Sequence, residues 1–219
     1  MPDLAVSTKV GDCEKLISNT PIEARLTVPV DAPSRVELVH LRDGCSVTIR
    51  PATAQDEPAL RSFLQGLCLE ARRLRFFTGA ADVSKAAHWA ASTGADRCGL
   101  VARDETGVLV GHAAYIQLDE TRELDEKRAE VAVEVADHLH DRGLGTILIE
   151  RLAMIAEQHG ITHFVAEVLS ENHAMLEVFR EGFDGRVVLH EGPEERVEFL
   201  TSGWRLARER FDMSTRREG

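Results

Sequence analysis

Two glycines separated by one leucine open an amphipathic pattern in the segment HDRGLG, residues 140–145. Glycine near the start of a helix costs backbone entropy, so this pair needs a reason. A loop that enters a helix leaves backbone N–H groups without intrahelical partners, and the helix dipole adds partial positive charge there. Because no Cβ blocks a close approach, a phosphate or a diphosphate suits such a loop. A tight turn without a ligand is the alternative interpretation.

The two most familiar phosphate-binding loops do not match this segment. A P-loop needs a lysine and then a serine or threonine after its last glycine, whereas Gly145 is followed by Thr146 and Ile147. A dinucleotide-binding fingerprint needs a third glycine at position 148, which is Leu148. A phosphate ligand therefore requires a loop of another kind.

Two carboxylates alternate with small and apolar residues just before the glycine loop, in the run AEVAVEVA of residues 129–136. On a strand, Glu130 and Glu134 share one face with Ala132, because side chains alternate between the two faces. Such a pair can attract a cationic amine or accept its proton. Alternating charge is also typical of solvated residues on an amphipathic strand, and for Glu134 we prefer that interpretation.

Composition narrows the class of protein. The chain has 219 residues, 43% of them hydrophobic and 29% charged, which indicates one well-cored domain with additional segments. A net charge of −11 argues against a general nucleic-acid binder, since neutralising phosphates needs a basic surface. The first residues lack a basic and apolar leader, no apolar run is long enough for a membrane span, and the four cysteines are widely spread. We expect a cytoplasmic protein with reduced thiols and no metal site.

Hydrophobic periodicity predicts the elements that must position these residues. We expect an N-terminal extension over 1–35, a domain over 36–203 and a tail over 204–219. Within the domain, a hairpin turns at Asp43-Gly44, and a capping box at Thr53 and Asp56 opens a helix. The buried face of that helix is predicted to consist of Leu60, Phe63, Leu64, Leu67 and Cys68.

The remaining elements alternate between strands and helices. A helix is expected over 83–92, strands over 97–103, 108–118 and 129–136, and, after the glycine loop, a long helix that ends at Gly160. A strand over 162–169, a helix over 172–181 and a closing pair of strands follow. This order predicts an α/β fold of the mixed α+β kind, with the glycine loop at a strand-to-helix junction.

The segment HDRGLG resembles motif A of the GNAT superfamily of N-acetyltransferases, written Gln/Arg-x-x-Gly-x-Gly/Ala. The run TIRPATAQDEPAL is similar to the first strand and helix of that family, and LSENHAMLEVFREGF resembles its motif B. More narrowly, RLRFF, AEVAVEVAD and LSENHAML are similar to bacterial Pat-type protein-lysine acetyltransferases. The resemblance covers about residues 36–200. It implies a GNAT-like central, mostly antiparallel sheet flanked by helices, with the cofactor in the cleft after the fourth strand.

The resemblance also implies roles for individual residues. The CoA pyrophosphate would be bound by the backbone N–H groups of Arg142, Gly143, Leu144, Gly145 and Thr146. The backbone around Val133 and Val135 would pair with the pantetheine amides, and Asn172 is the motif-B asparagine near the cofactor. In Pat-type members the general base is the Glu of an Ala-Glu-hydrophobic-Ala run, which makes Glu130 the candidate here and Glu134 the second. His140 replaces the usual Gln or Arg, which implies one weaker phosphate contact with the backbone cradle kept.

We therefore expect an enzyme that moves an acetyl group from acetyl-CoA to a primary amine by direct attack in a ternary complex. The narrower resemblance favours a protein lysine as the acceptor. A small-molecule amine acetyltransferase remains the first alternative, and a non-catalytic acyl-CoA-binding regulatory module the second. Neither a nucleic acid nor a membrane is expected as a partner.

Overall fold

A computed structural model describes residues 36–77, 81–118 and 126–205. The predicted extension over 1–35 and all but the first two residues of the predicted tail lie outside the described residues. The strands are β1 (Glu37–His40), β2 (Ser46–Pro51), β3 (Arg97–Asp104), β4 (Leu109–Gln117), β5 (Lys127–Val135), β6 (Ile161–Leu169), β7 (Arg186–Glu191) and β8 (Glu194–Leu200). The helices are α1 (Glu57–Gly66), α2 (Leu69–Phe76), α3 (Val83–Ala91), α4 (Leu144–Gln158) and α5 (His173–Phe183), with short 3-10 turns η2 (Ala54–Asp56) and η3 (Asp137–Leu139).

The strands form one sheet in the order β1-β2-β3-β4-β5-β6-β8-β7. Among the described strands, β5 and β6 are the one parallel pair, and every other neighbouring pair is antiparallel. A parallel pair needs a crossover connection, and α4 supplies it. The predicted mixed α/β fold with a mostly antiparallel sheet is therefore confirmed.

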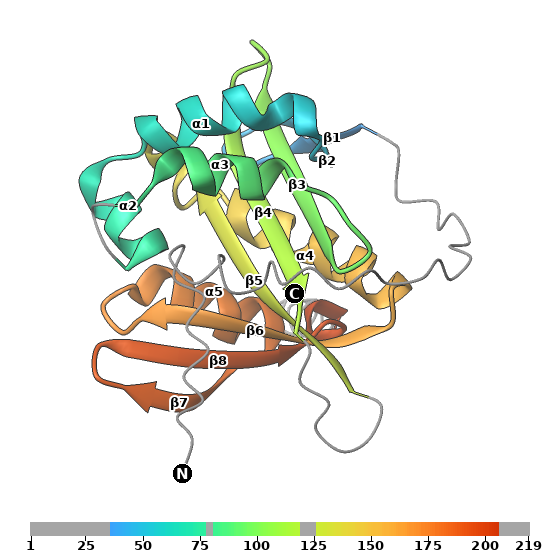
Figure 1. Cartoon of the computed structure of the whole chain (residues 1–219), viewed down its shortest axis with the longest axis vertical. Helices are drawn as coiled ribbons and strands as arrows, with labels where there is room; N and C mark the ends of the chain where they lie inside the picture. Colours follow the sequence, from blue (N-terminus) through green and yellow to red (C-terminus); the bar gives the residue numbers. More distant parts are fainter. Residues whose placement is uncertain (1–35, 78–80, 119–125, 206–219) are drawn as a thin grey trace, which may run out of the picture.

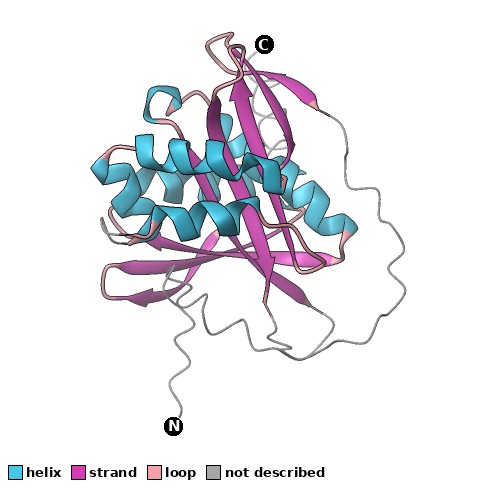
Figure 2. Cartoon of the chain, turned by 45° about the horizontal axis from the view of Figure 1, so that its top comes forward, coloured by secondary structure: helices cyan, strands magenta, loops and turns pink. Residues whose placement is uncertain are grey.

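Helices cover both faces of this sheet (Figure 1). The larger apolar core lies between the sheet and the pair α4 and α5, and the smaller one lies between the sheet and the pair α1 and α3. Figures 1 and 2 show α1 and α3 lying across the first half of the sheet, whereas the β8–β7 hairpin extends beyond them. Every residue of β7 is accordingly exposed.

Local signals explain where most elements begin and end. The N–H of Thr53 donates to the Asp56 carboxylate at 2.9 Å, so the predicted capping box is present. Pro58 occupies the first turn of α1, where a missing N–H costs nothing. Asp82 accepts from the N–H groups of Ser84 and Lys85 and so caps α3. The predicted left-handed glycine after α4 is found at Gly160, with φ of +76°.

One predicted helix is in fact two. The periodic pattern over Leu60 to Cys68 predicted a single helical face, but α1 ends at Gly66 and Leu67 turns extended, with ψ of 140°. Leu67 remains buried in the smaller core, whereas Cys68 is exposed and caps α2. The burial of Leu67 is thus confirmed, whereas the single continuous helix and the burial of Cys68 were wrong, because an apolar residue at helical spacing can be buried without a continuous helix.

Candidate active site

The glycine loop lies between β5 and α4, as predicted. After η3 the backbone takes left-handed conformations at Asp141, with φ of +61°, and at Gly143, with φ of +86°. Gly143 is the N-cap of α4, which begins at Leu144 and is 15 residues long. The N–H groups of the first turn, which include Leu144, Gly145 and Thr146, have no carbonyl partners within the helix. The loop therefore presents a row of donors at the positive end of a long helix.

The glycine loop continues from an edge of β5 that its neighbour leaves open. Pairing with β6 is confined to Lys127 through Glu130, although both strands are described well beyond that point. From Val131 to Val135 the strand keeps its register with β4 on the other side. The strand before the loop is the fifth in this chain rather than the fourth, because the first hairpin contributes two strands.

The direction of the backbone groups decides which residues face this open edge. The N–H of Ala136 donates to Val110 O of β4 at 2.9 Å, and backbone groups alternate between the two edges of a strand. Val133 and Val135 therefore turn their N–H and C=O groups away from β4. In agreement with this direction, Nε2 of His140 lies 3.1 Å from Val135 O. The side chain of His140, the first residue of motif A, is thus hydrogen-bonded to the last backbone carbonyl of β5.

Glu130 lies at the point where the two strands separate. It is the last residue of β5 that pairs with β6, where it stands opposite Val165. Its side chain is partly exposed. Val131 and Val133 face the α4 side of the sheet, since both pack into the larger core. Glu130 consequently lies on the opposite face, together with Ala132 and Glu134.

Glu134 is not a solvated residue, and the preferred interpretation of it was wrong. It is 7% exposed, with Nε of Arg75 at 2.8 Å from one carboxylate oxygen and Nδ1 of His112 at 2.8 Å from the other. Burial alone would raise the pKa of Glu134, but Arg75 and His112 outweigh that effect and lower the pKa to about 2. Both carboxylate oxygens are therefore occupied by a structural ion pair.

Helix α2 contains most of the run RLRFF that carries part of the resemblance, but the sequence predicted no role in the site for this helix. Its contacts reach both β5 and β6, on either side of the open edge. The N–H of Cys68 donates to Asp137 at 3.0 Å, Arg75 pairs with Glu134, and Arg73 pairs with Glu171 in the connection after β6. The arginine-rich run EARRLRF was the available signal, but the partners that Arg75 and Arg73 reach across the site, Glu134 and Glu171, are 59 and 98 residues away.

The motif-B asparagine caps α5. The side-chain oxygen of Asn172 accepts from the N–H of Met175 at 3.2 Å. This cap orients the start of the helix that follows β6, on the far side of the open edge from the glycine loop. The structure therefore arranges the predicted residues of β5 and the loop in one continuous run, with Asn172 on the neighbouring connection.

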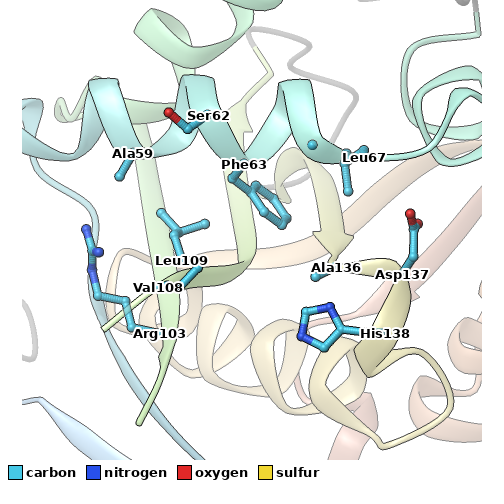
Figure 3. A pocket seen from close by; sticks show the side chains of 11 residues that line it. Ala59, Ser62, Phe63, Leu67, Arg103, Val108, Leu109, Ala136, Asp137 and His138 are labelled. Carbon is cyan, nitrogen blue, oxygen red and sulfur yellow. The ribbon is translucent and has the colours of Figure 1, made fainter. Parts of the chain in front are cut away.

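A separate cavity of about 510 Å³ lies between α1, the β3–β4 hairpin and η3 (Figure 3). Its lining is mainly apolar, with Phe63, Leu67 and Leu109, and it also includes His138 and Arg103. None of the predicted site residues lines it. Along β5, Glu130 is six residues from the lining residue Ala136, which is about 20 Å at 3.3 Å per residue. This cavity is therefore distinct from the surroundings of Glu130.

The described residues also bear on metal ions, reactive thiols and membrane spans. Within residues 36–77, 81–118 and 126–205, no group of three His, Cys, Asp or Glu side chains is placed to hold a metal ion. The three cysteines in that part of the chain, Cys45, Cys68 and Cys98, are free thiols. No helix of the described chain combines the length and the apolar composition needed to cross a membrane.

Comparisons with known proteins agree with this geometry. The family model for the acetyltransferase (GNAT) family matches residues 68–183, just over half of the chain. The GNAT domain of S. lividans PAT is 32% identical, with a TM-score of 0.67, and the match covers 75% of this chain and 96% of that one.

Two more distant structures share the fold. The cAMP-binding acyltransferase from Mycobacterium smegmatis is 22% identical with a TM-score of 0.51, and its match covers 76% of this chain but 47% of that longer one. The acetyltransferase yncA from Salmonella typhimurium, solved with its cofactor acetyl-CoA, is 22% identical with a TM-score of 0.54, over 71% of this chain and 94% of that one. The matched residues include β5, the glycine loop and α4 together, and on these grounds the chain belongs to the acetyltransferase (GNAT) family.

Proposed function

We propose that a domain spanning residues 36–203 transfers an acetyl group from acetyl-CoA to a primary amine, and that this amine is a protein lysine. One observation carries the proposal: the open edge of β5 leads directly into the glycine loop, and Glu130 lies where that edge begins. A single stretch of chain thus carries N–H groups that can donate to a phosphate, a strand edge that can pair with amides, and the carboxylate of Glu130.

The residues present fit acetyl-CoA. The N–H groups of the loop from Arg142 to Thr146 would hold its diphosphate. The outward backbone groups of Val133 and the outward N–H of Val135 would pair with its pantetheine amides, since the carbonyl of Val135 is bonded to His140. At Gly145 an added Cβ would meet only Val135, at 3.8 Å, so the approach to the loop is open on that side. Asn172, the N-cap of α5, would lie near the bound cofactor.

The chemistry needs a proton acceptor beside the amine. A lysine amine has a pKa of about 10.4, so deprotonating it at pH 7 costs about 4.6 kcal/mol at 1.36 kcal/mol per pKa unit. Bound acetyl-CoA would supply an electrophilic thioester carbonyl and a thiolate leaving group. Glu130 accepts the proton of the attacking amine, directly or through a water molecule. Glu134 holds α2 against β5 through its ion pair with Arg75, so it is a positioning residue rather than a second base.

The surroundings of Glu130 support a macromolecular acceptor. The cavity of Figure 3 is remote from Glu130, so it does not enclose an amine there. On the same face of the sheet, Arg128 pairs with Glu198 and Arg196 pairs with Glu167, and these side chains form a partly exposed polar surface over β5, β6 and β8. An open, charged surface suits an extended protein segment better than a small metabolite.

The test is to measure binding first and transfer second. Calorimetry of the purified chain should show saturable binding of acetyl-CoA, with ATP and NAD as controls that do not bind. Lysine-containing proteins and peptides should then be acetylated faster than free primary amines at equal concentration. Binding without transfer to any amine would contradict the enzymatic proposal, and transfer to small amines alone would contradict the protein acceptor.

The two glycines of the loop have different roles, which a pair of alanine variants can separate. Gly143 has φ of +86°, so Gly143→Ala should cost about 1–2 kcal/mol of stability and distort the loop. Gly145→Ala meets only an ordinary contact and should gain up to about 1 kcal/mol of helix stability.

We expect Gly143→Ala to weaken acetyl-CoA binding about tenfold or more, since one misplaced N–H already costs a charge-assisted hydrogen bond. Gly145→Ala should bind within about threefold of wild type, because the motif itself admits alanine there. Urea unfolding and calorimetry measure the two effects. Equal losses of affinity in both variants would contradict the distinction.

A further inference from the structure

The turn of the first hairpin packs against the glycine loop, although the two are about 100 residues apart in the sequence. The N–H of Arg42 donates to Arg142 O at 3.2 Å. The guanidinium of Arg142 pairs with the carboxylate of Asp43 and lies 3.8 Å from Sγ of Cys45. The hairpin turn is therefore a second wall of the loop, contributed by β1 and β2 rather than by the neighbouring strands.

Within this turn, the side chain of Arg42 lies over Gly143. A Cβ built on Gly143 would be 3.4 Å from Nε of Arg42, 3.7 Å from its Cγ and 3.8 Å from its Cδ. The stem and the guanidinium thus cover the residue that caps α4. Because a Cβ there would make only ordinary van der Waals contacts with the arginine, glycine is required at this position by the left-handed backbone of the cap and not by Arg42.

The charge of Arg42 is not neutralised in the part of the chain that the structure describes. Over those residues neither a hydrogen bond nor an ion pair involves its exposed guanidinium, whereas Arg142 is paired with Asp43. The two arginines at the loop thus differ: one holds the hairpin in place, and the other is left with its charge beside the helix N-terminus. In a chain with a net charge of −11, an unneutralised cation at this point locally offsets the repulsion of an anionic ligand.

We propose that Arg42 binds a phosphate of CoA with its side chain, in addition to the backbone N–H groups of the loop. The proposal rests on the proposed function, since it requires acetyl-CoA at this loop. It assigns a role to a residue that precedes the family match of 68–183 and belongs to neither motif A nor motif B. CoA offers two sources of the same chemistry, its diphosphate and its 3′-phosphate, and Arg42 recognises a phosphate oxygen in either case.

The experiment is calorimetry of the full chain with CoA and with 3′-dephospho-CoA, for wild type, Arg42→Gln, Arg42→Lys and a matched control. Arg186→Gln is the control, because it removes the same charge from an exposed side chain of β7. Arg42→Gln should weaken CoA binding roughly tenfold, the loss expected for one charge-assisted contact, and Arg42→Lys should recover part of that loss. Arg186→Gln should bind as wild type does, and thermal unfolding should be unchanged in all variants.

Each outcome decides a different point. A loss for CoA and not for 3′-dephospho-CoA places Arg42 on the 3′-phosphate, and an equal loss for both places it on the diphosphate. Wild-type affinity of Arg42→Gln for both ligands, or an equal loss in Arg186→Gln, would overturn the role of Arg42 while wild-type binding still supports the proposed function. Failure of wild type to bind acetyl-CoA or CoA would overturn the proposed function and this inference together.

Discussion

Replacing Glu130 with glutamine should lower kcat about 100- to 1,000-fold, the range expected when a general base is removed. Glutamine keeps the size and the hydrogen-bonding capacity of the side chain, but it cannot accept a proton at neutral pH. Glu130 lies on the face of β5 opposite the α4 core and outside the glycine loop, so the Kd for acetyl-CoA should change by less than about twofold. Steady-state transfer to a lysine peptide and calorimetry measure the two quantities.

The matched control is Glu191→Gln, which removes one carboxylate from the exposed end of β7. It should acetylate as fast as wild type. The pH profile adds a readout that a purely structural role would not change. Wild-type kcat/KM should level off above the pH at which the base is protonated, whereas kcat/KM of Glu130→Gln should follow the fraction of unprotonated amine and keep rising about tenfold per pH unit toward the amine pKa of about 10.4. A Glu130→Gln variant that turns over as fast as wild type would show that another group accepts the proton.

Replacing Glu134 with glutamine should destabilise the fold by about 3 kcal/mol at pH 7. Glutamine resembles the protonated acid, and the pKa of Glu134 is lowered from 4.5 to about 2, at 1.36 kcal/mol per unit. The variant leaves Arg75 and the fully buried His112 beside a neutral partner. Urea unfolding measures the loss. Glu70→Gln on the same helix is the control, because its pair with Arg73 is exposed and screened by solvent, so its loss should be much smaller.

The same pair predicts a pH dependence whose sign follows from the direction of the shift. A carboxyl whose pKa is lower in the folded state contributes its full stability above the unfolded value of 4.5 and loses it as the pH falls toward about 2. The free energy of unfolding of wild type should therefore fall through this window more steeply than that of Glu134→Gln, and the two should converge near pH 2. A difference that stays constant from pH 7 to pH 2 would contradict the ion pair as its source.

Much of the architecture was already contained in local sequence patterns. The Asp43-Gly44 turn, the capping box at Thr53, the run of strands from Arg97 to Val135 and the glycine at position 160 all appear as predicted. Each depends on interactions within a few residues, such as a cap, a turn conformation or the alternation of side chains along a strand. Motif A was recognisable for the same reason, because its glycines are adjacent to the helix they serve.

The break after Gly66 shows where local patterns stop being sufficient. Leu67 keeps the apolar spacing of α1 and is buried, yet its backbone is extended, and Cys68 starts a new helix instead of joining the buried face. Periodicity reports which residues reach the core, but it does not report whether the backbone between them is continuous. Tertiary contacts favour the break, here the hydrogen bond from the N–H of Cys68 to Asp137 in η3, just after β5.

The sequence alone determined the strand, the glycine loop and the order of elements that make the candidate site, because these depend on local conformation. Only the tertiary structure decided what each side chain there faces. Period-two alternation placed Glu130 and Glu134 on one face, but α2 and β4 bring Arg75 and His112 to Glu134 alone. Arg42 reaches Gly143 only because the first hairpin folds against the loop. Partners so far apart in the sequence leave no local pattern, and their charges acquire a role only when the sheet assembles.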